Sequence, residues 1–242
     1  MSNTCGIYKE DKTLFARWRS IERKQHRLLP CVENPTARAY LSTELPDKKT
    51  PIDEVEFLSV DFETTGLNAK KEAILSMGYM PYKNGRISMA SSYCEVIKLN
   101  RALPAKSVVI HHITDDRMNA GVPLHDALDR LVEAAKGKVL LVHYAKIERD
   151  FLEAATKRVY GKSLPFLMVD TMQIERKRME YKQQEIQSNQ LRLANLRKKY
   201  HLPPYGAHDA LEDAIATAEL FMAQLAEKQQ GNTALRLGDV LC

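Results

Sequence analysis

The stretch Val55-Glu-Phe-Leu-Ser-Val-Asp-Phe-Glu-Thr-Thr-Gly66 decides the fold. Its first half is mostly apolar, which is typical of a buried strand. If the strand continues, Asp61 and Glu63 point to one side of it and Phe62 points to the other. Two neighbouring acids at the end of a buried strand repel each other and are costly to desolvate. Mg²⁺ or Mn²⁺, which prefer oxygen ligands, would relieve both costs. Solvated acids before a turn are the alternative interpretation of this stretch taken alone.

The segments that follow predict two further strands. An apolar run over residues 73–82 ends near the turn Lys83-Asn-Gly85, and a second run over residues 87–97 follows directly. Connections this short join neighbouring antiparallel strands. The first three strands are therefore expected to form an antiparallel three-strand meander.

Helices and strands alternate in the rest of the sequence. Apolar side chains over residues 124–135 recur at helical spacing, and Gly137 follows where a helix end is expected. The next predicted elements are a strand over residues 139–142, a helix from about Ala145 and a short strand over residues 166–169, before further helices. This order predicts an α/β fold in which a βαβ unit extends the meander into a mixed sheet flanked by helices.

Three regions are expected along the chain. Residues 1–53 are interpreted as a basic helical arm followed by a proline-containing linker, residues 54–228 as the main domain and residues 229–242 as a short tail. Residues 1–52 hold ten basic and six acidic residues, so they contribute most of the net charge of +5. The arm either docks its apolar stripe on the main domain or binds a protein or nucleic-acid partner.

The composition of the 242-residue chain is that of an ordinary globular protein, with 28% charged and 44% hydrophobic residues. A transmembrane helix is not expected, because no run of about 18 apolar residues occurs. The polar N-terminus lacks the apolar core of a secretory signal. The four cysteines are scattered without a CxxC spacing, which argues against a thiolate zinc site and a disulfide scaffold. We expect a cytoplasmic protein with no membrane partner.

A second acidic segment, from His143 to Asp150, offers two candidate acids. On a helix, Glu148 falls within the apolar arc that contains Ile147 and Phe151, whereas Asp150 lies about 200° round from Glu148. A glutamate on a buried face needs a metal or a charged partner. Glu148 is therefore the candidate ligand, Asp150 is interpreted as a surface acid, and His143 as a structural histidine.

A third segment, His208-Asp-Ala-Leu-Glu-Asp213, opens an amphipathic helix. Asp209 and Glu212 have the spacing of a capping box. With Asp209 as the N-cap, His208 and Asp213 occupy the two positions that approach each other in a hydrophobic staple. A histidine beside a carboxylate is a candidate general base. Plain helix capping with a surface histidine is the alternative for this segment alone.

Together, the three segments offer four carboxylates and a base that could converge on one site: Asp61, Glu63, Glu148, Asp213 and His208. Such a site would hold two divalent cations beside a group able to activate water. Two ions about 3.5–4 Å apart stabilise the attacking and leaving oxygens of phosphodiester hydrolysis. The set therefore indicates metal-dependent cleavage of a phosphodiester bond.

The same motifs resemble those of the DnaQ-like DEDDh 3′–5′ exonucleases. The segment Asp61-Phe-Glu-Thr-Thr-Gly66 is similar to the family's DxETTG motif, and the segment from His208 to Asp213 is similar to its HxxxxD motif. The segment Ile110-His-His-Ile-Thr114 resembles a family HGIT segment. The resemblance extends over about residues 54–228, and it implies that this region is an exonuclease domain with a ribonuclease H-like fold.

The resemblance also implies individual roles. Two Mg²⁺ or Mn²⁺ ions would be bound, with Asp61 bridging both, and His208 would deprotonate the attacking water. The implied metal ligands are Asp61, Glu63, Glu148 and Asp213, and the implied substrate-binding residues are Phe62, Thr64, Thr65, Gly66 and His111. The chain departs from the family pattern at Glu148, where Asp is usual, and at His112, where Gly is usual.

We therefore expect a metal-dependent 3′–5′ exonuclease that acts on 3′ ends of single-stranded DNA and releases nucleoside 5′-monophosphates. Residues 176–199, with eight basic and two acidic residues, either guide the nucleic acid or form a solvated helical face. Two alternatives stay open. One is an exoribonuclease of the same fold. The other, suggested by Glu148, is a weakened or inactive nuclease-fold module that binds nucleic acid or a polymerase.

Overall fold

A six-stranded mixed sheet forms the centre of the computed structural model, which describes residues 12–99, 115–206, 208–229 and 234–241. The strands are β1 (Phe57–Thr64), β2 (Ile74–Lys83), β3 (Arg86–Ile87), β4 (Tyr93–Val96), β5 (Val139–Val142) and β6 (Met168–Asp170). The strand order is β3-β2-β1-β5-β6, and β4 also pairs with β2. β1 is antiparallel to β2 and parallel to β5, which is itself parallel to β6. The expected mixed sheet of a meander joined to a βαβ unit is confirmed.

The third strand of the meander is interrupted, contrary to the single strand expected over residues 87–97. β3 pairs with the end of β2 and β4 pairs with its middle, and a 3₁₀ turn over Met89–Ser91 separates them. The Ser92 hydroxyl donates a hydrogen bond to the Met89 carbonyl at 2.8 Å. Serine side chains that bond nearby backbone groups compete with strand pairing, which explains the break.

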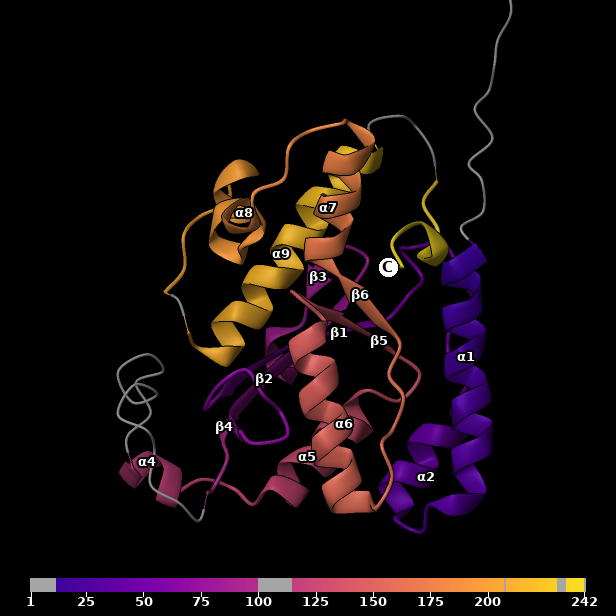
Figure 1. Cartoon of the computed structure of the whole chain (residues 1–242), viewed down its shortest axis with the longest axis vertical. Coiled ribbons are helices and arrows are strands. Elements are labelled where there is room, and N and C mark those ends of the chain that lie inside the picture. The colour runs from indigo at the N-terminus through magenta and orange to yellow at the C-terminus, as the bar shows by residue number, and fades with distance from the viewer. Residues whose placement is uncertain (1–11, 100–114, 207, 230–233, 242) are drawn as a thin grey trace, which may run out of the picture.

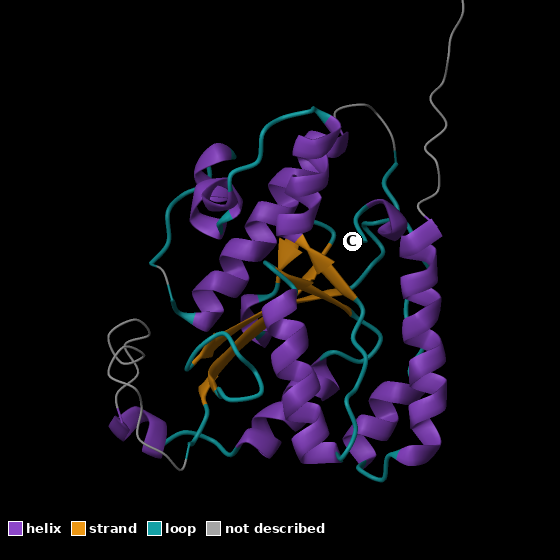
Figure 2. Ribbon diagram, viewed as in Figure 1, coloured by secondary structure: helices purple, strands orange, loops and turns teal. Residues whose placement is uncertain are grey.

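Helices cover both faces of the sheet (Figures 1 and 2). The α-helices in the described residues are α1 (Lys12–Leu28), α2 (Pro35–Ser42), α4 (Asp115–Asn119), α5 (Leu124–Ala134), α6 (Lys146–Tyr160), α7 (Thr171–Tyr181), α8 (Leu193–Lys199) and α9 (Ala210–Gln229). Side chains of α2, α5 and α6 form one hydrophobic cluster with Leu58, Val60 and Phe62 of β1. Side chains of α7 and α9 form a second cluster with Phe57. Alternate residues of β1 therefore face different layers, as the pleat of a strand requires.

The α2 helix belongs to the hydrophobic core. Its N-cap Asn34 accepts a hydrogen bond from the Ala37 amide at 2.9 Å. Tyr40 is buried, and its hydroxyl donates to the Pro165 carbonyl at 2.8 Å. This stretch, interpreted from the sequence as part of a proline-containing linker, is therefore a helix that docks on the domain. The boundaries drawn at residues 53 and 229 stay a prediction.

The linker after α2 and the C-terminal segment clasp each other. The Ile52 amide donates to the Leu235 carbonyl at 2.9 Å, and the Leu237 amide donates to the Thr50 carbonyl at 2.9 Å. Leu235 and Leu237 are buried in the same cluster as Ile52 and α9. The segment expected as a short tail therefore contributes to the core.

None of the described helices combines the length and the apolar character that crossing a bilayer requires.

Candidate active site

Strand β1 presents Asp61 and Glu63 from the face of the sheet that α9 covers. Glu63 is buried and Asp61 is partly exposed. Burial raises the pKa of Asp61 well above its usual range, and the nearby carboxylates of Glu148, Asp213, Glu63 and Asp209 raise it further. Burial and the carboxylates of Asp213 and Asp209 raise the pKa of Glu63 to about 7. The two acids thus lie in an environment that disfavours their charged forms until a cation is present.

The first turn of α9 brings the third motif to the same place. The Asp209 carboxylate accepts hydrogen bonds from the amides of Leu211 at 3.0 Å and Glu212 at 3.1 Å, so the expected N-cap is confirmed. The His208 amide donates to Asp213 at 3.2 Å, which joins the two staple positions. His208 has a φ of 71°, in the left-handed region that a non-glycine residue rarely adopts. Ligand atoms of Glu63, His208 and Asp213 all lie within 4.8 Å of one another.

Gly78, which the sequence motifs did not indicate, allows the start of α9 to lie close to the sheet. Gly78 of β2 stands opposite Asp61 in the β1–β2 register. A Cβ at Gly78 would lie 2.2 Å from the Ala210 carbonyl carbon and 2.3 Å from the Leu211 amide nitrogen. The backbone of α9 therefore touches the backbone of β2 beside Asp61. Only a residue without a side chain fits this contact.

The Glu148 side chain faces inward from the first turn of α6. It is 3% exposed, and its Oε2 atom has no hydrogen-bond partner among the described residues. Burial raises the pKa of Glu148 to about 8. Asp150, by contrast, has a 38% exposed side chain and forms an ion pair with Lys146. The helical-face argument therefore identified the acid that faces the interior.

The other polar groups around this edge of the sheet have structural partners. The His143 ring nitrogens contact the Thr171 hydroxyl at 2.7 Å and the Leu191 carbonyl at 2.9 Å, and burial lowers its pKa. Asp170 accepts hydrogen bonds from the amides of Tyr144, Ala145, Met172 and Gln173. Asp170 thus fixes the beginnings of α6 and α7, and its carboxylate oxygens are occupied. Neither residue is a candidate ligand.

The acid set fits a divalent cation. Glu63, Glu148 and Asp213 act on Asp61 electrostatically. Within the part of the chain that the structure describes, the buried Oε2 atom of Glu148 has no donor. Crowded carboxylates with raised pKa values are stabilised by a hard cation that accepts oxygen ligands. Asp61, Glu63, Glu148 and Asp213 are the side chains that could hold such an ion.

The predicted substrate-binding residues differ in where their side chains lie. The Thr65 hydroxyl is bonded to the Glu72 carboxylate, and it accepts the Ala73 amide at 3.0 Å. The Thr64 hydroxyl donates to the Gly66 carbonyl at 2.9 Å, so these residues shape the turn that follows the acids. The Phe62 side chain is buried in the core on the other face of β1, away from Asp61 and Glu63. His111 lies outside the described residues.

Half of the basic side chains over residues 176–199 are engaged in ion pairs. Glu175 is fully buried and accepts hydrogen bonds from Arg178, Lys199 and Tyr200. Arg197 is buried and bonds Glu219 at 2.7 Å. Lys182 and Arg178 pair with Glu227 of α9. These cations hold α7, α8 and α9 together. The other four, Arg176, Lys177, Arg192 and Lys198, are exposed.

We expect Glu175→Gln to destabilise the protein by about 2–4 kcal/mol, because the fully buried side chain loses the charge that accepts hydrogen bonds from Arg178, Lys199 and Tyr200. Burial alone would raise the pKa of Glu175, but the hydrogen bonds from Arg178, Lys199 and Tyr200 outweigh it and lower the pKa to about 2. The stabilisation is therefore present above the unfolded-state pKa and is lost as the pH falls towards 2. Urea unfolding at several pH values measures this. An equal loss for Glu175→Gln at pH 3 and pH 7 would contradict it.

Comparisons with known proteins show the family to which the chain belongs. The RNase T family model, described as an exonuclease, matches residues 58–221. The chain is 29% identical over 182 residues to the DNA polymerase III subunit epsilon of Treponema pallidum, covering 74% of this chain and 82% of that protein. It is 25% identical to the PolC-type DNA polymerase III of Thermotoga maritima. That alignment covers 70% of this chain but only 12% of the much longer polymerase.

Solved structures share the fold. E. coli Exonuclease I in complex with a dT13 oligonucleotide superposes with a TM-score of 0.61 at 17% identity, covering 74% of this chain and 42% of that one. Exonuclease X in complex with 5′ overhanging duplex DNA superposes with a TM-score of 0.54 at 22% identity, covering 76% of this chain and 98% of that one. The expected ribonuclease H-like architecture is therefore confirmed.

Proposed function

Since this chain belongs to the RNase T exonuclease family, and is thus a DnaQ-like 3′–5′ exonuclease, we propose that it removes nucleotides from the 3′ ends of single-stranded DNA. The reaction would use two Mg²⁺ or Mn²⁺ ions and release nucleoside 5′-monophosphates. A cytoplasmic location, consistent with four scattered cysteines, is part of this proposal.

One observation carries the proposal. Carboxylates from β1, α6 and α9, elements far apart in sequence, influence one another at one edge of the sheet. Among them, Glu148 has a buried oxygen atom to which no group in the described residues donates a hydrogen bond. A buried cluster of acids is costly in a protein that never binds a cation. Its presence beside a histidine supports hydrolysis rather than simple binding.

The ions, when bound, would stabilise the charge that develops on the phosphate and on the leaving oxygen. With the ions bound, Asp61 and Asp213 would keep their negative charge, and Glu63 and Glu148 would complete the ligand set. A ring nitrogen of His208 accepts the proton of the attacking water. Because His208 is exposed, the proton can then pass to solvent. The positive φ of His208 and the hydrogen bond from its backbone amide to the Asp213 carboxylate fix the backbone that carries the base.

A nuclease assay tests this proposal directly. Single-stranded DNA labelled at its 5′ end should yield a ladder of products shortened from the 3′ end, with Mg²⁺ or Mn²⁺ and not with a chelator. A labelled RNA of the same sequence should be degraded more slowly. Faster loss of the RNA would favour an exoribonuclease. Binding of either strand without cleavage would favour an inactive nuclease-fold module.

We expect Glu148→Gln to lower kcat about a hundredfold or more, because the variant keeps the shape of the side chain but not its charge. The matched control is Asp150→Asn, two residues along the same helix, where the acid is exposed and paired with Lys146. Its kcat should stay within about twofold of wild type. Steady-state kinetics with saturating Mn²⁺ measure both, and a larger loss for Asp150→Asn would overturn the assignment of the second-motif acid.

A further inference from the structure

Residues 202–206 lead from α8 towards His208, and they form neither a helix nor a strand. Two of them are prolines, which have no backbone N–H to donate, and residues 203–206 are exposed. An exposed segment without regular secondary structure opens readily unless side chains hold it. The position of His208 therefore depends on what holds this segment.

A buried side chain of α8 contacts the segment at two points. Arg197 is 3% exposed, and its Nη2 atom donates to the Pro203 carbonyl at 2.7 Å. The same guanidinium lies over the ring of Tyr205, with its Cζ atom 4.6 Å from the ring centroid. A planar guanidinium can make both contacts at once, because its donors lie in its plane and its face can stack on a ring. Arg197 therefore fixes both Pro203 and Tyr205.

The guanidinium is also bonded to α9, the helix that carries Asp213 and lies beside α8 (Figure 1). Its Nη1 atom donates to the Ala216 carbonyl at 2.8 Å, and its Nη2 atom pairs with the Glu219 carboxylate at 2.7 Å. The Tyr205 hydroxyl donates to the other carboxylate oxygen of Glu219 at 2.9 Å. Arg197, Tyr205 and Glu219 thus form a clamp that joins the segment to α9.

The chemistry of the clamp favours a role in placement over one in stability. The Nε atom of Arg197 is buried, and no group in the described residues accepts a hydrogen bond from it. A buried cation with an unused donor is costly to desolvate, and an apolar side chain of similar volume often packs equally well.

The clamp is close enough to His208 to limit its position. His208 follows Tyr205 by three residues, which can span at most about 11 Å. His208 also has a φ of 71°, and a strained backbone of this kind persists only where the surrounding structure fixes it. Because the clamp is bonded to α9, it fixes the approach to His208 relative to Asp213.

We propose that Arg197 is a positioning residue, which holds His208 where its ring can accept the proton of the attacking water. It acts through residues 202–206 and not by contact with the acids. The inference rests on the proposed function, because that function makes His208 the base. It gives one buried cation of residues 176–199 a role in setting kcat, and none in guiding the nucleic acid.

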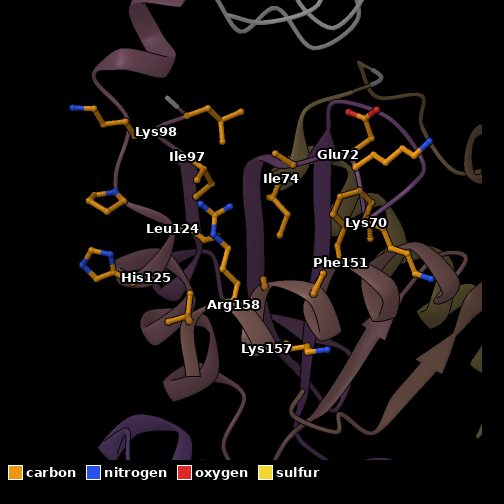
Figure 3. Close-up of a pocket in the computed structure, with 18 residues that line it drawn as sticks. Lys70, Glu72, Ile74, Ile97, Lys98, Leu124, His125, Phe151, Lys157 and Arg158 are labelled. Carbon is orange, nitrogen blue, oxygen red and sulfur yellow. The ribbon is translucent and has the colours of Figure 1, made fainter. Parts of the chain in front are cut away.

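Three variants test the inference. Arg197→Met keeps most of the volume of the side chain but loses the guanidinium. Tyr205→Ala removes the partner that is 41% exposed, so it opens the clamp with little risk to folding. The matched control is Arg158→Met, which replaces an exposed arginine of α6 at a groove on the face of the sheet that also buries Phe62 (Figure 3).

Native-state proteolysis reports on the segment without any need for nuclease activity. Chymotrypsin can cleave after Tyr205 only when the segment opens. We expect Arg197→Met to raise the rate of this cleavage about tenfold and to leave the rate after Tyr181, an exposed tyrosine at the end of α7, within about twofold. Arg158→Met should match wild type at both sites. An unchanged rate after Tyr205 in Arg197→Met would overturn the inference.

Kinetics on single-stranded DNA with Mn²⁺ show whether the segment acts through His208. Arg197→Met and Tyr205→Ala should each lower kcat about ten- to a hundredfold and leave KM within about twofold, because the base is misplaced while the substrate contacts remain. In a His208→Ala background, Arg197→Met should cost less than about twofold, since the group that it positions is gone. Mn²⁺ should raise the Tm of Arg197→Met as much as that of wild type, because the acids are unchanged.

Equal losses of kcat from Arg197→Met with and without His208 would overturn the inference, because the effect would then reach the site by another route. A raised KM with wild-type kcat would also overturn it, since that is the pattern of a lost substrate contact. No cleavage of DNA by wild type would overturn the proposed function and, with it, the role of His208. Failure of the inference alone leaves wild type fully active, so the two results are distinct.

Discussion

Asp61→Asn should abolish exonuclease activity while making the metal-free protein more stable. The change removes a ligand charge that the other acids of the cluster surround, so we expect kcat to fall about a thousandfold or more. In a chelator, the charged form of Asp61 is disfavoured by burial and by the carboxylates of Glu148 and Asp213. Removing that charge should raise Tm by roughly 2–4 °C, which corresponds to about 1 kcal/mol in a protein of this size.

Differential scanning calorimetry with and without Mn²⁺ separates the two effects. Mn²⁺ should raise the Tm of wild type and raise that of Asp61→Asn much less, because ligand binding stabilises only the state that binds. Asp53→Asn, which changes an exposed acid shortly before β1, is the control and should behave as wild type in both measurements. Substantial nuclease activity in Asp61→Asn would contradict a metal-dependent mechanism centred on this residue.

Gly78→Ala should damage the site without touching any acid. The new Cβ would lie 2.2 Å from the backbone of Ala210, so α9 or β2 must move. We expect a loss of stability of about 1–3 kcal/mol from overpacking. The first turn of α9 carries Asp213, and His208 immediately precedes it. A displacement of about 1 Å there should cost about a hundredfold in kcat.

Ser59→Ala is the matched comparison for this prediction. The Ser59 hydroxyl donates to the Ala214 carbonyl at 2.7 Å, so its loss weakens the contact between β1 and α9 without pushing them apart. Both variants should lower Tm, but only Gly78→Ala should lower kcat strongly at a temperature well below its Tm. Wild-type kcat in Gly78→Ala would mean that the close approach of α9 to β2 does not set the geometry of the site.

Local sequence patterns predicted the elements whose burial follows a simple period. Alternation along β1 separated Asp61 and Glu63 from Phe62, and the structure places them on opposite faces. Helical periodicity placed Glu148 inside and Asp150 outside, as observed. The Asp209 cap followed from residue type and spacing. In each case the orientation of the side chain depends on a single helix or strand, so the sequence of that element is sufficient to predict it.

The remaining features depend on contacts between distant segments. Gly78 is significant only because Ala210 lies against it, and nothing near Gly78 in the sequence indicates that contact. The positive charge of residues 176–199 suggested a nucleic-acid guide, yet acids on α7 and α9 engage Arg178, Arg197 and Lys199. Charge counting in a window cannot detect a partner that lies outside the window. The clasp between the linker and residues 235–241 was missed for the same reason.

That clasp has a consequence for the order of events during synthesis. Ile52 and Val55 leave the ribosome long before Leu235 and Leu237, with which they share a hydrophobic cluster. While the nascent chain is incomplete, the apolar surface around the start of β1 lacks its final cover. The domain can therefore reach its full packing only after residues 235–241 have emerged, and until then this apolar surface is open to association with other chains.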